Sequence, residues 1–279
     1  MAVYITGDTH GGLTIRKLES KRFPEGKKLT KEDYLIVLGD FGIWKTKRAQ
    51  DFLRWISDKK WTTLFVEGNH EDYEYLKTFP MVNMFGSKVR KINDSVYQLL
   101  RGEVYEIEEK KIFTFGGARS VDRYTSCRVE GVDWFPEEES TYEEECVALD
   151  NLSKVSNKVD FILTHTCSKS TLSELGELYR IYIENYDNQN KFLEEIKNNI
   201  EYSAWAFGHI HKDYRVNQKE FAVFDRVLNI EELLKPANPI TFEKFTFSKN
   251  TPSYTYSEIH KIAKDGVSNF KYEELNNKK

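Results

Sequence analysis

The stretch Gly7-Asp8-Thr9-His10-Gly11 decides how the rest of the chain is interpreted. It comes directly after the apolar run Val3-Tyr4-Ile5, which predicts a buried β-strand. Alternate side chains at the end of a strand share a face, so Asp8 and His10 can turn toward one point, and the following Gly11-Gly12 lets the backbone bend away. A carboxylate and an imidazole that face a common point can bind a metal ion. The stretch therefore predicts part of a metal site.

The same arrangement recurs further along the chain. Each of four later apolar runs ends in a turn that carries polar side chains: Leu35–Leu38 before Gly39-Asp40, Leu64–Val66 before Gly68-Asn69-His70-Glu71, Phe161–Leu163 before Thr164-His165, and Trp205–Phe207 before Gly208-His209-Ile210-His211. Between the first two of these runs, Phe52, Trp55 and Ile56 have the spacing of a helix face. Alternating strands and helices are typical of α/β proteins, whose sites lie at the carboxyl ends of strands.

The middle of the chain predicts other elements. Two runs, 104–107 and 112–115, flank a charged turn and predict a hairpin. The acidic run Glu137-Glu138-Glu139 is expected to be solvated, and it precedes a helix whose buried stripe we expect at Tyr142, Cys146 and Leu149. A later helix face is predicted at Leu193, Ile196 and Ile200. Residues 168–186 fit either a loop beside the site or an inserted helix, and both alternatives stay open.

Composition restricts the class of protein. A chain of 279 residues with 39% hydrophobic and 14% aromatic residues can bury a real core, and a net charge of −4 gives no global field that attracts nucleic acid or an anionic membrane. No apolar run approaches the roughly 20 residues of a membrane span, and the N-terminus has no signal-peptide pattern. The scattered cysteines indicate reduced thiols, and we expect Cys167 to be a small buried residue. The expectation is a cytoplasmic protein with no membrane partner, of unknown oligomeric state.

The histidines favour one joint metal site. The chain has 6 of them, and all except His260 lie in turns directly after buried apolar runs. The candidate ligands are carboxylate, amide and imidazole groups without thiolates: Asp8, His10, Asp40, Asn69, His165, His209 and His211. This set suits divalent Mn first, with Fe, Zn or Mg as alternatives. It has more donors than one catalytic metal uses, and it therefore suits two metal ions that share a bridging carboxylate.

The ordered motifs Gly-Asp-x-His-Gly, Gly-Asp, Gly-Asn-His-Glu, a lone histidine after a strand, and Gly-His-x-His resemble the calcineurin-like metallophosphoesterase family. They span Gly7 to His211, and as an ordered set they are highly specific. The resemblance implies an α/β fold, a four-layer α/β/β/α sandwich of two mixed sheets flanked by helices, with a dinuclear metal site. We expect a metallophosphoesterase domain over residues 1–228 and a C-terminal extension over residues 229–279, packed on or next to it.

The resemblance also implies a role for each motif residue. The ligands of the first metal would be Asp8, His10, Asp40 and His211. Those of the second would be Asp40, Asn69, His165 and His209, with Asp40 as the bridge. His70 resembles the family's non-ligand histidine, which contacts the phosphate and protonates the leaving group. Catalysis is therefore expected to depend on Asp40 and His70, although His70 as a mere spacer is the alternative.

Two positions depart from the family pattern. Ile43 stands where a second Asp often follows the bridging one, which puts in doubt the groups that support the ligands, not metal binding itself. Glu71 stands after His70 where Asp is also common, and we interpret it as orienting its neighbours. Nearby, Trp44 is expected to pack in the core, with stacking on a substrate ring as the alternative.

Substrate contacts are expected from Arg119 and Arg123, which follow a Gly-Gly turn, together with Asn69. Guanidinium groups bind phosphate oxygens well, but pairing with acids such as Asp122 or Glu130 is an equal alternative. Residues 124–140 and the tail after residue 229 would shape the pocket.

The expected function is hydrolysis of a phosphate mono- or diester by attack of a metal-bridging hydroxide, with His70 assisting departure of the leaving group. A nucleotide or nucleic-acid phosphodiesterase or nuclease is the alternative among enzymes. A non-catalytic metal-binding interaction scaffold is the alternative from another class, and the completeness of the ligand set argues against it.

Overall fold

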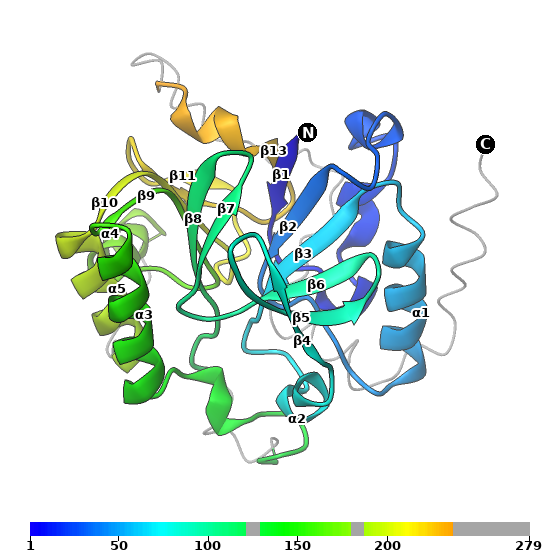
Figure 1. The fold of residues 1–279 in the computed structure, drawn as a ribbon, viewed down its shortest axis with the longest axis horizontal. Coiled ribbons are helices and arrows are strands. Elements are labelled where there is room, and N and C mark those ends of the chain that lie inside the picture. The colour runs from blue at the N-terminus through cyan, green and yellow to red at the C-terminus, as the bar shows by residue number, and fades with distance from the viewer. Residues whose placement is uncertain (121–128, 180–186, 237–279) are drawn as a thin grey trace. The chain divides into compact units, whose positions relative to one another are not determined.

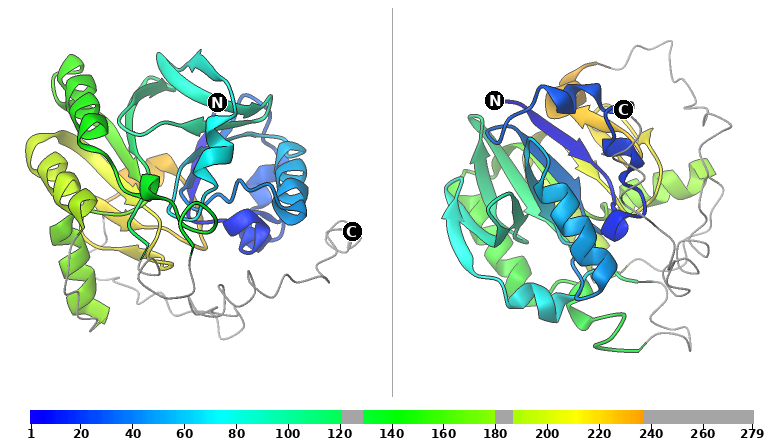
Figure 2. Two further views of the ribbon diagram at one scale, coloured as in Figure 1. Left: turned by 90° about the horizontal axis from the view of Figure 1, so that it is seen from below. Right: turned by 90° about the vertical axis from the view of Figure 1, so that its right-hand side faces the viewer.

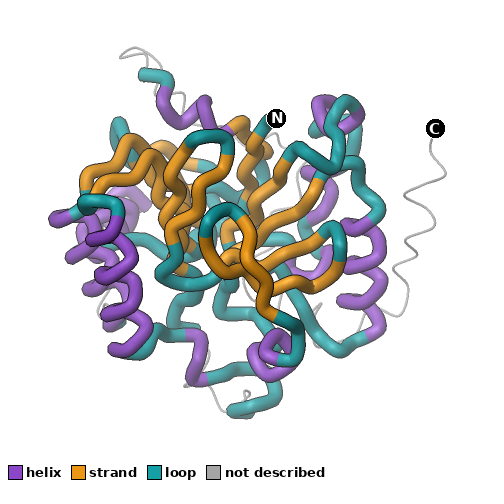
Figure 3. Tube along the Cα trace, in the orientation of Figure 1, coloured by secondary structure: helices purple, strands orange, loops and turns teal. Residues whose placement is uncertain are grey.

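The computed structural model describes residues 1–120, 129–179 and 187–236. These residues fall in one compact unit, Met1–Ala237. Strands and helices alternate along them, as the apolar runs and helical spacings predict. Figures 1 and 3 show the strands in the middle of this unit, with helices on its two outer sides.

Seven strands form the first sheet, in the order β13-β1-β2-β3-β6-β5-β4. Strands β1, β2, β3 and β6 pair in parallel and the flanking strands pair antiparallel, so the sheet is mixed. The strands are β1 Val3–Thr6, β2 Tyr34–Leu38, β3 Thr62–Val66, β4 Met81–Met84, β5 Ser87–Asn93, β6 Val96–Leu99 and β13 Val227–Asn229. Parallel pairing brings the carboxyl ends of β1, β2 and β3 to one edge.

Six strands form the second sheet, in the order β11-β12-β10-β9-β8-β7. Strands β8, β9, β10 and β12 pair in parallel, and β7 and β11 pair antiparallel at the two edges. The strands are β7 Val104–Ile107, β8 Lys110–Phe115, β9 Lys158–Thr164, β10 Glu201–Phe207, β11 Tyr214–Arg215 and β12 Glu220–Ala222. The hairpin predicted from residues 104–107 and 112–115 is confirmed as β7 and β8.

The largest hydrophobic cluster lies between the two sheets. Ile36 and Leu38 of β2 belong to the same buried cluster as Phe161 and Leu163 of β9. Alternate side chains of a strand point to opposite faces, so each sheet has a second face to cover. The two sheets therefore form the inner layers of the unit.

Helices cover the outer face of each sheet (Figure 2). Phe65 of β3 stacks on Phe41 with ring centroids 4.4 Å apart, and Phe41 contacts Phe52 of the helix over the first sheet. A second buried cluster joins Phe207 of β10 to the helices over the second sheet. The helices are α1 Lys47–Ser57, α2 Tyr73–Lys77, α3 Tyr142–Lys154, α4 Lys169–Tyr179 and α5 Asn188–Asn199. The predicted four-layer α/β/β/α sandwich is confirmed.

Side-chain caps fix where the main helices begin. Thr46 caps α1, Thr141 caps α3 and Asp187 caps α5, and each accepts a hydrogen bond from a backbone N–H of the first turn. Glu144 completes a capping box with Thr141. The predicted helix face at Leu193, Ile196 and Ile200 is buried, as α5 and its C-terminal cap. Of the two alternatives for residues 168–186, α4 shows a helix over Lys169–Tyr179.

The predicted buried stripe of α3 is wrong. Tyr142 is 76% exposed, Cys146 is exposed and Leu149 is 36% exposed, whereas Ala148 and Leu152 are buried. The helix packs closely on the turn at Gly102, where a Cβ atom would meet the Cβ of Ala148 at 3.0 Å. A small side chain therefore packs at this turn, with Leu152 buried on the same side, whereas Tyr142, Val147 and Leu149 are exposed.

The acidic run before α3 also differs from its prediction. Glu138 is fully buried in a short 3-10 helix, Pro136–Glu138, although the whole run was expected to be solvated. Its carboxylate accepts hydrogen bonds from backbone N–H groups, which replace water as its partners. Cys167 is buried as expected, and burial raises the pKa of its thiol.

The described chain continues beyond β13 into a 3-10 helix, Ile230–Leu234, whose Ile230 and Leu233 are buried in the cluster between the sheets. Residues 237–279 and the predicted Arg123 lie outside the described residues. The domain boundary after residue 228 and the role of the tail stay predictions. Within the described residues, no helix is long and apolar enough to cross a membrane.

Candidate metal centre

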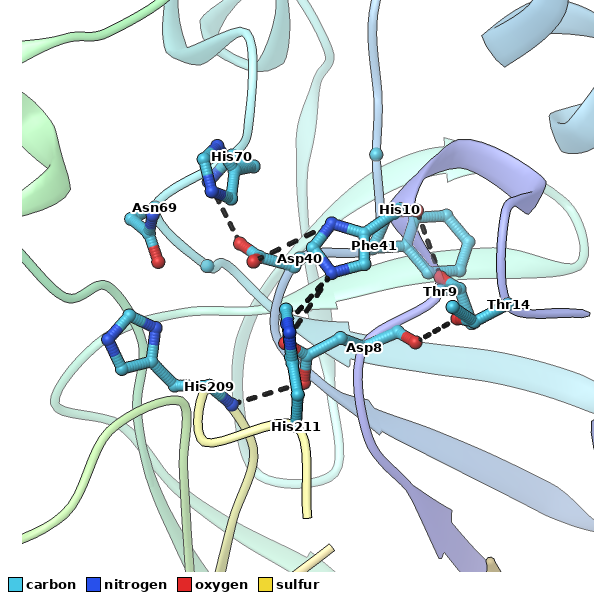
Figure 4. Close-up of polar contacts among 12 residues, drawn as sticks. Asp8, Thr9, His10, Thr14, Asp40, Phe41, Asn69, His70, His209 and His211 are labelled. Atoms are coloured by element: carbon cyan, nitrogen blue, oxygen red, sulfur yellow. Dashed lines mark hydrogen bonds and ion pairs between the residues drawn. The ribbon is translucent and has the colours of Figure 1, made fainter. Parts of the chain in front are cut away.

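The predicted ligands lie in turns that follow five strands of the two sheets. Asp8 and His10 follow β1, Asp40 follows β2, and Asn69 follows β3. In the second sheet His165 follows β9, and His209 and His211 follow β10, which pairs in parallel with β9. Figure 4 shows side chains from both sheets around the carboxylates of Asp8 and Asp40.

Unusual backbone conformations turn these side chains toward one another. His10, Asp40, His209 and His211 have positive φ angles of 46°, 45°, 64° and 53°. Such angles are uncommon for residues other than glycine and cluster at functional sites. Gly39 leaves room for the second sheet, because a Cβ atom there would come within 2.0 Å of the His165 ring. The turns therefore combine strained backbone conformations with close packing, and the carboxyl ends of strands from the two sheets lie close together.

The first group of donors is compact. Asp8, His10, Asp40 and His211 each offer one ligand atom, and these atoms all lie within 4.8 Å of one another. His211 Nε2 is 3.0 Å from both His10 Nε2 and Asp8 Oδ2. The buried Oδ2 of Asp8 accepts no well-directed hydrogen bond. A buried carboxylate oxygen that lacks a donor and faces two imidazole nitrogens fits a cation at this point.

The second group has acceptor atoms that face one another. His165 Nδ1 lies 2.8 Å from the carbonyl oxygen of Leu38, which can only accept, so Nδ1 carries the hydrogen. In neutral His165 the lone pair is then on Nε2, which lies 3.0 Å from Asn69 Oδ1 and 3.4 Å from Asp40 Oδ1. The His209 ring lies beside His165, with centroids 4.9 Å apart. Converging lone pairs again fit a metal ion, and a fixed tautomer is typical of metal-binding histidines.

Burial and the charges of neighbouring histidines lower the pKa of His10 and of His209. Burial lowers the pKa of His10 well below its usual value, and the neighbouring His211 lowers it further. Burial, then the charge of His165, lowers the pKa of His209 to about 3. Neutral imidazole is the form that binds metals, so these nitrogens are available as ligands near neutral pH.

The pKa values of Asp8 and Asp40 shift in opposite directions. Burial would raise the pKa of Asp8, but its interactions with His211, His165 and His10 together hold the pKa below its usual range. Burial raises the pKa of Asp40, and the neighbouring Asp8 raises it further. Two buried carboxylates this close repel each other, and a divalent ion relieves that repulsion. Asp40 contacts ligands of both groups, since its Oδ2 is 3.8 Å from His10 Nδ1 and its Oδ1 is 3.4 Å from His165 Nε2.

Glu71 holds the turn that carries Asp40. Its buried carboxylate accepts hydrogen bonds from the backbone N–H groups of Phe41, Gly42 and Ile43, at 2.6, 3.0 and 2.9 Å. Burial, then the charge of Asp40, raises the pKa of Glu71 to about 8. Glu71 therefore orients its neighbours as expected, and its hydrogen bonds support the turn in which Ile43 replaces the family's second Asp.

His70 lies at the edge of the donor groups. Its backbone N–H donates to Asp40 Oδ1 at 2.8 Å, and its ring centroid is 5.8 Å from that of His10. The indole Nε1 of Trp44 donates to the carbonyl oxygen of His70 at 3.1 Å, and the half-buried Trp44 ring contacts Phe135. Trp44 is half-buried and belongs to neither buried cluster, so the choice between core packing and stacking on a substrate ring stays a prediction.

The expected substrate contacts receive less support. Arg119 is half-buried, and its charge lowers the pKa of Asp187, an acid not foreseen as its partner, while burial raises that pKa overall. Arg123 is not among the described residues. Phosphate contacts from these arginines stay predictions.

Sequence reasoning missed several residues that hold the ligands. Lys17 is buried, and its Nζ donates to the carbonyl oxygens of Gly7 and Asp8 at 2.9 and 2.8 Å. Ser120 Oγ accepts a hydrogen bond from Asn69 Nδ2 at 2.9 Å. Arg48 Nη2 donates to the carbonyl oxygen of His10 at 3.0 Å. No motif marks these three side chains, because their contacts depend on how separate turns fold against each other.

Known proteins resemble this chain over most of its length. Lariat debranching enzyme from Schizosaccharomyces pombe is 25% identical over 241 residues, which are 77% of this chain and 49% of that protein. Lariat debranching enzyme A from Xenopus laevis is 23% identical over 236 residues, 76% of this chain and 43% of that protein. The chain thus spans about half the length of these curated relatives or less.

A crystal structure of a protein of unknown function from Aquifex aeolicus is 19% identical, with a TM-score of 0.32, over 72% of this chain and 87% of that one. The family model described as calcineurin-like phosphoesterase matches residues 1–213. Because this match covers most of the 279 residues, the chain belongs to the calcineurin-like phosphoesterase family.

Proposed function

We propose that this chain is a phosphoesterase that hydrolyses a phosphate mono- or diester with two divalent metal ions, manganese first among the candidates. The observation that carries the proposal is the pair of donor groups that share the buried Asp40. Family membership supports metal-dependent phosphoester hydrolysis in general. The free thiols of Cys146 and Cys167 support a cytoplasmic location.

The proposed ligand sets follow the two donor groups. Asp8, His10, Asp40 and His211 would hold one ion, and Asp40, Asn69, His165 and His209 would hold the other. Two such ions lower the pKa of a water molecule and neutralise charge on a phosphate ester. The protein keeps His10 and His209 neutral by burial and holds the turn around Asp40 through Glu71.

His70 is proposed to act on the leaving group. The turn that carries it is held on both sides, through its N–H to Asp40 and through its carbonyl oxygen to Trp44. A histidine beside the site can donate a proton to the leaving oxygen as negative charge develops there. Its half-buried position supports contact with a substrate.

A nucleic-acid phosphodiester is a second candidate substrate. The observation that favours it is the similarity to two lariat debranching enzymes. The net charge of −4 gives no general attraction to nucleic acid, so recognition would have to come from the surroundings of the site.

The test is a paired hydrolysis assay on protein stripped with a chelator and reloaded with Mn²⁺. An aryl phosphate monoester, its bis-aryl diester and a short single-stranded oligonucleotide are the substrates, and bound metal is measured in the same samples. We expect metal-dependent turnover of at least one ester, and its loss in Asp40→Asn. The matched control is Asp94→Asn, because the Asp94 side chain is 91% exposed and should not affect turnover.

The pattern of turnover separates the candidates. Preference for the oligonucleotide over both aryl esters would favour the nucleic-acid phosphodiesterase. Two bound ions without turnover of any substrate would contradict the enzyme proposal and favour a metal-binding scaffold.

A further inference from the structure

Lys17 is a buried lysine whose charged group binds backbone oxygen atoms. Its Nζ donates hydrogen bonds to the carbonyl oxygens of Gly7, Asp8 and Phe224, at 2.9, 2.8 and 2.5 Å. An ammonium group has three hydrogens and can only donate, and a carbonyl oxygen can only accept, so the direction of each hydrogen bond is fixed. Lys17 is 1% exposed, and these oxygens therefore replace water as the partners of its charge.

Two of these hydrogen bonds fix the backbone of Asp8. The carbonyl oxygen of Gly7 belongs to the peptide unit before the Asp8 Cα, and the carbonyl oxygen of Asp8 belongs to the unit after it. Peptide units are planar, so the orientation of these two units sets φ and ψ of Asp8 and the direction of its Cα–Cβ bond. Thr14 Oγ1 also donates to the Asp8 carbonyl oxygen. Lys17 therefore helps to set where the Asp8 carboxylate points.

The third hydrogen bond holds a turn that crosses between the sheets. Strand β12 belongs to the second sheet and β13 to the first, so residues 223–226 connect the two. This turn lies very close to the end of β1, because a Cβ atom at Gly7 would come within 2.1 Å of the carbonyl oxygen of Val223. Carbonyl oxygens of both segments meet at the Lys17 ammonium group, whose positive charge offsets their mutual repulsion.

Phe224, in this turn, packs beside a metal ligand that follows the second sheet. Its ring lies next to the imidazole of His211, with centroids 4.8 Å apart. Its backbone N–H donates to Asp213 Oδ1 at 2.8 Å, and its carbonyl oxygen accepts from Lys17. The peptide units on both sides of the Phe224 Cα are thus held, as they are at Asp8, and the ring keeps its place beside His211.

We propose that Lys17 is a positioning residue for the first metal position, where it keeps Asp8 and His211 directed at one ion. The two ligands come from different sheets, and His211 Nε2 lies 3.0 Å from Asp8 Oδ2. This inference rests on the proposed function, because it needs a metal ion at these ligands. The second ion, which would bind Asn69 and His165, should depend on Lys17 much less.

The test is Mn²⁺ binding by Lys17→Met, which keeps an unbranched side chain and removes the donors. We expect the affinity for one of two ions to fall about 10- to 100-fold, as for other groups that orient ligands. Two backgrounds identify the ion, since His211→Ala removes a ligand of the first and His209→Ala a ligand of the second. Lys17→Met should cost the same factor in His209→Ala, but less than about threefold in His211→Ala. Calorimetry gives the stoichiometry and the affinities.

A second lysine controls for general damage to the fold. Lys197 is partly buried, and its Nζ donates to Thr171 Oγ1 and to the carboxylate of Glu220, at 2.9 and 3.0 Å. Lys197→Met therefore also removes a lysine from a buried polar network, and urea unfolding compares its stability with that of Lys17→Met. We expect Lys197→Met to bind both Mn²⁺ ions with the affinity of the parent protein.

Phe224→Leu answers the same question if Lys17→Met does not fold. It keeps the carbonyl oxygen that Lys17 binds and removes the ring beside His211, so it should weaken the first ion and leave the second unchanged. Unchanged affinity for the first ion in Lys17→Met, or in Phe224→Leu where that variant is needed, would overturn the inference. Equal losses from Lys17→Met in both histidine backgrounds would also overturn it. If the parent protein binds fewer than two Mn²⁺ ions, the proposed function fails rather than the role of Lys17.

Discussion

His70 contacts Asp40 through its backbone N–H, and His209 contacts Asp8 in the same way. The rings of His10, His165 and His211 have nitrogen atoms within 4 Å of an aspartate oxygen. Of these five histidines, His70 alone is outside the proposed ligand sets. A ring that does not bind a metal can be removed without loss of the metal.

We therefore predict that His70→Ala retains both metal ions and loses about 100- to 10,000-fold in kcat, the range for one general acid. Metal content and kcat are measured on the same sample, with an ester of low leaving-group pKa for comparison. The loss should shrink with that ester, because its leaving group needs less protonation. Loss of a metal ion would instead make His70 a ligand, and full turnover with every ester would remove it from the mechanism.

At the scale of elements, the strands that carry ligands could be predicted and several others could not. Strand β3 is buried along its whole length, so its apolar run is plain in the sequence. Strand β5 has only Val89 and Ile92 buried among its seven residues, and no prediction was made for β4, β5 or β6. Strands with only one covered face give weak patterns.

The buried side of α3 is a second feature that the sequence pattern did not predict. Periodicity predicted the helix, but its buried side is formed by Ala148 and Leu152 rather than by Tyr142, Cys146 and Leu149, because Ala148 packs on Gly102. Close approach between backbones depends on the other element, which hydrophobicity along one helix does not reveal.

This packing leads to a prediction for α3. Ala148→Leu should lower the free energy of unfolding by about 1–3 kcal/mol, because the added atoms overfill the contact with Gly102. Leu149→Ala should change it by less than about 0.5 kcal/mol, because Leu149 is exposed. Urea unfolding measures both. A larger loss of unfolding free energy from Leu149→Ala would instead support the buried stripe at Tyr142, Cys146 and Leu149 that the sequence predicts.

For the whole molecule, the candidate site joins the two sheets. Asp8, Asp40 and Asn69 come from the first sheet, and His165 and His209 from the second. The sequence indicated these residues because each follows a buried run. It did not indicate Ser120 or Lys17. Ser120 contacts a residue 51 positions away, and Lys17 contacts residues 9 and 10 positions away, without any recurring spacing. Ligands are thus easier to predict than the groups that orient them.

Metal ions that bind between the sheets should stabilise the whole fold. The unfolded chain cannot hold ligands from both sheets together, so each bound ion favours the folded state by about 2.7 kcal/mol at 100 times its dissociation constant. For a unit of this size we predict that each bound Mn²⁺ raises Tm by about 5–10 °C and that a chelator reverses the rise. Asp40→Asn should abolish most of the rise, because Asp40 contacts both donor groups. Asp94→Asn, at an exposed turn, should keep it. An equal rise in Asp40→Asn would mean that the stabilising ions bind elsewhere.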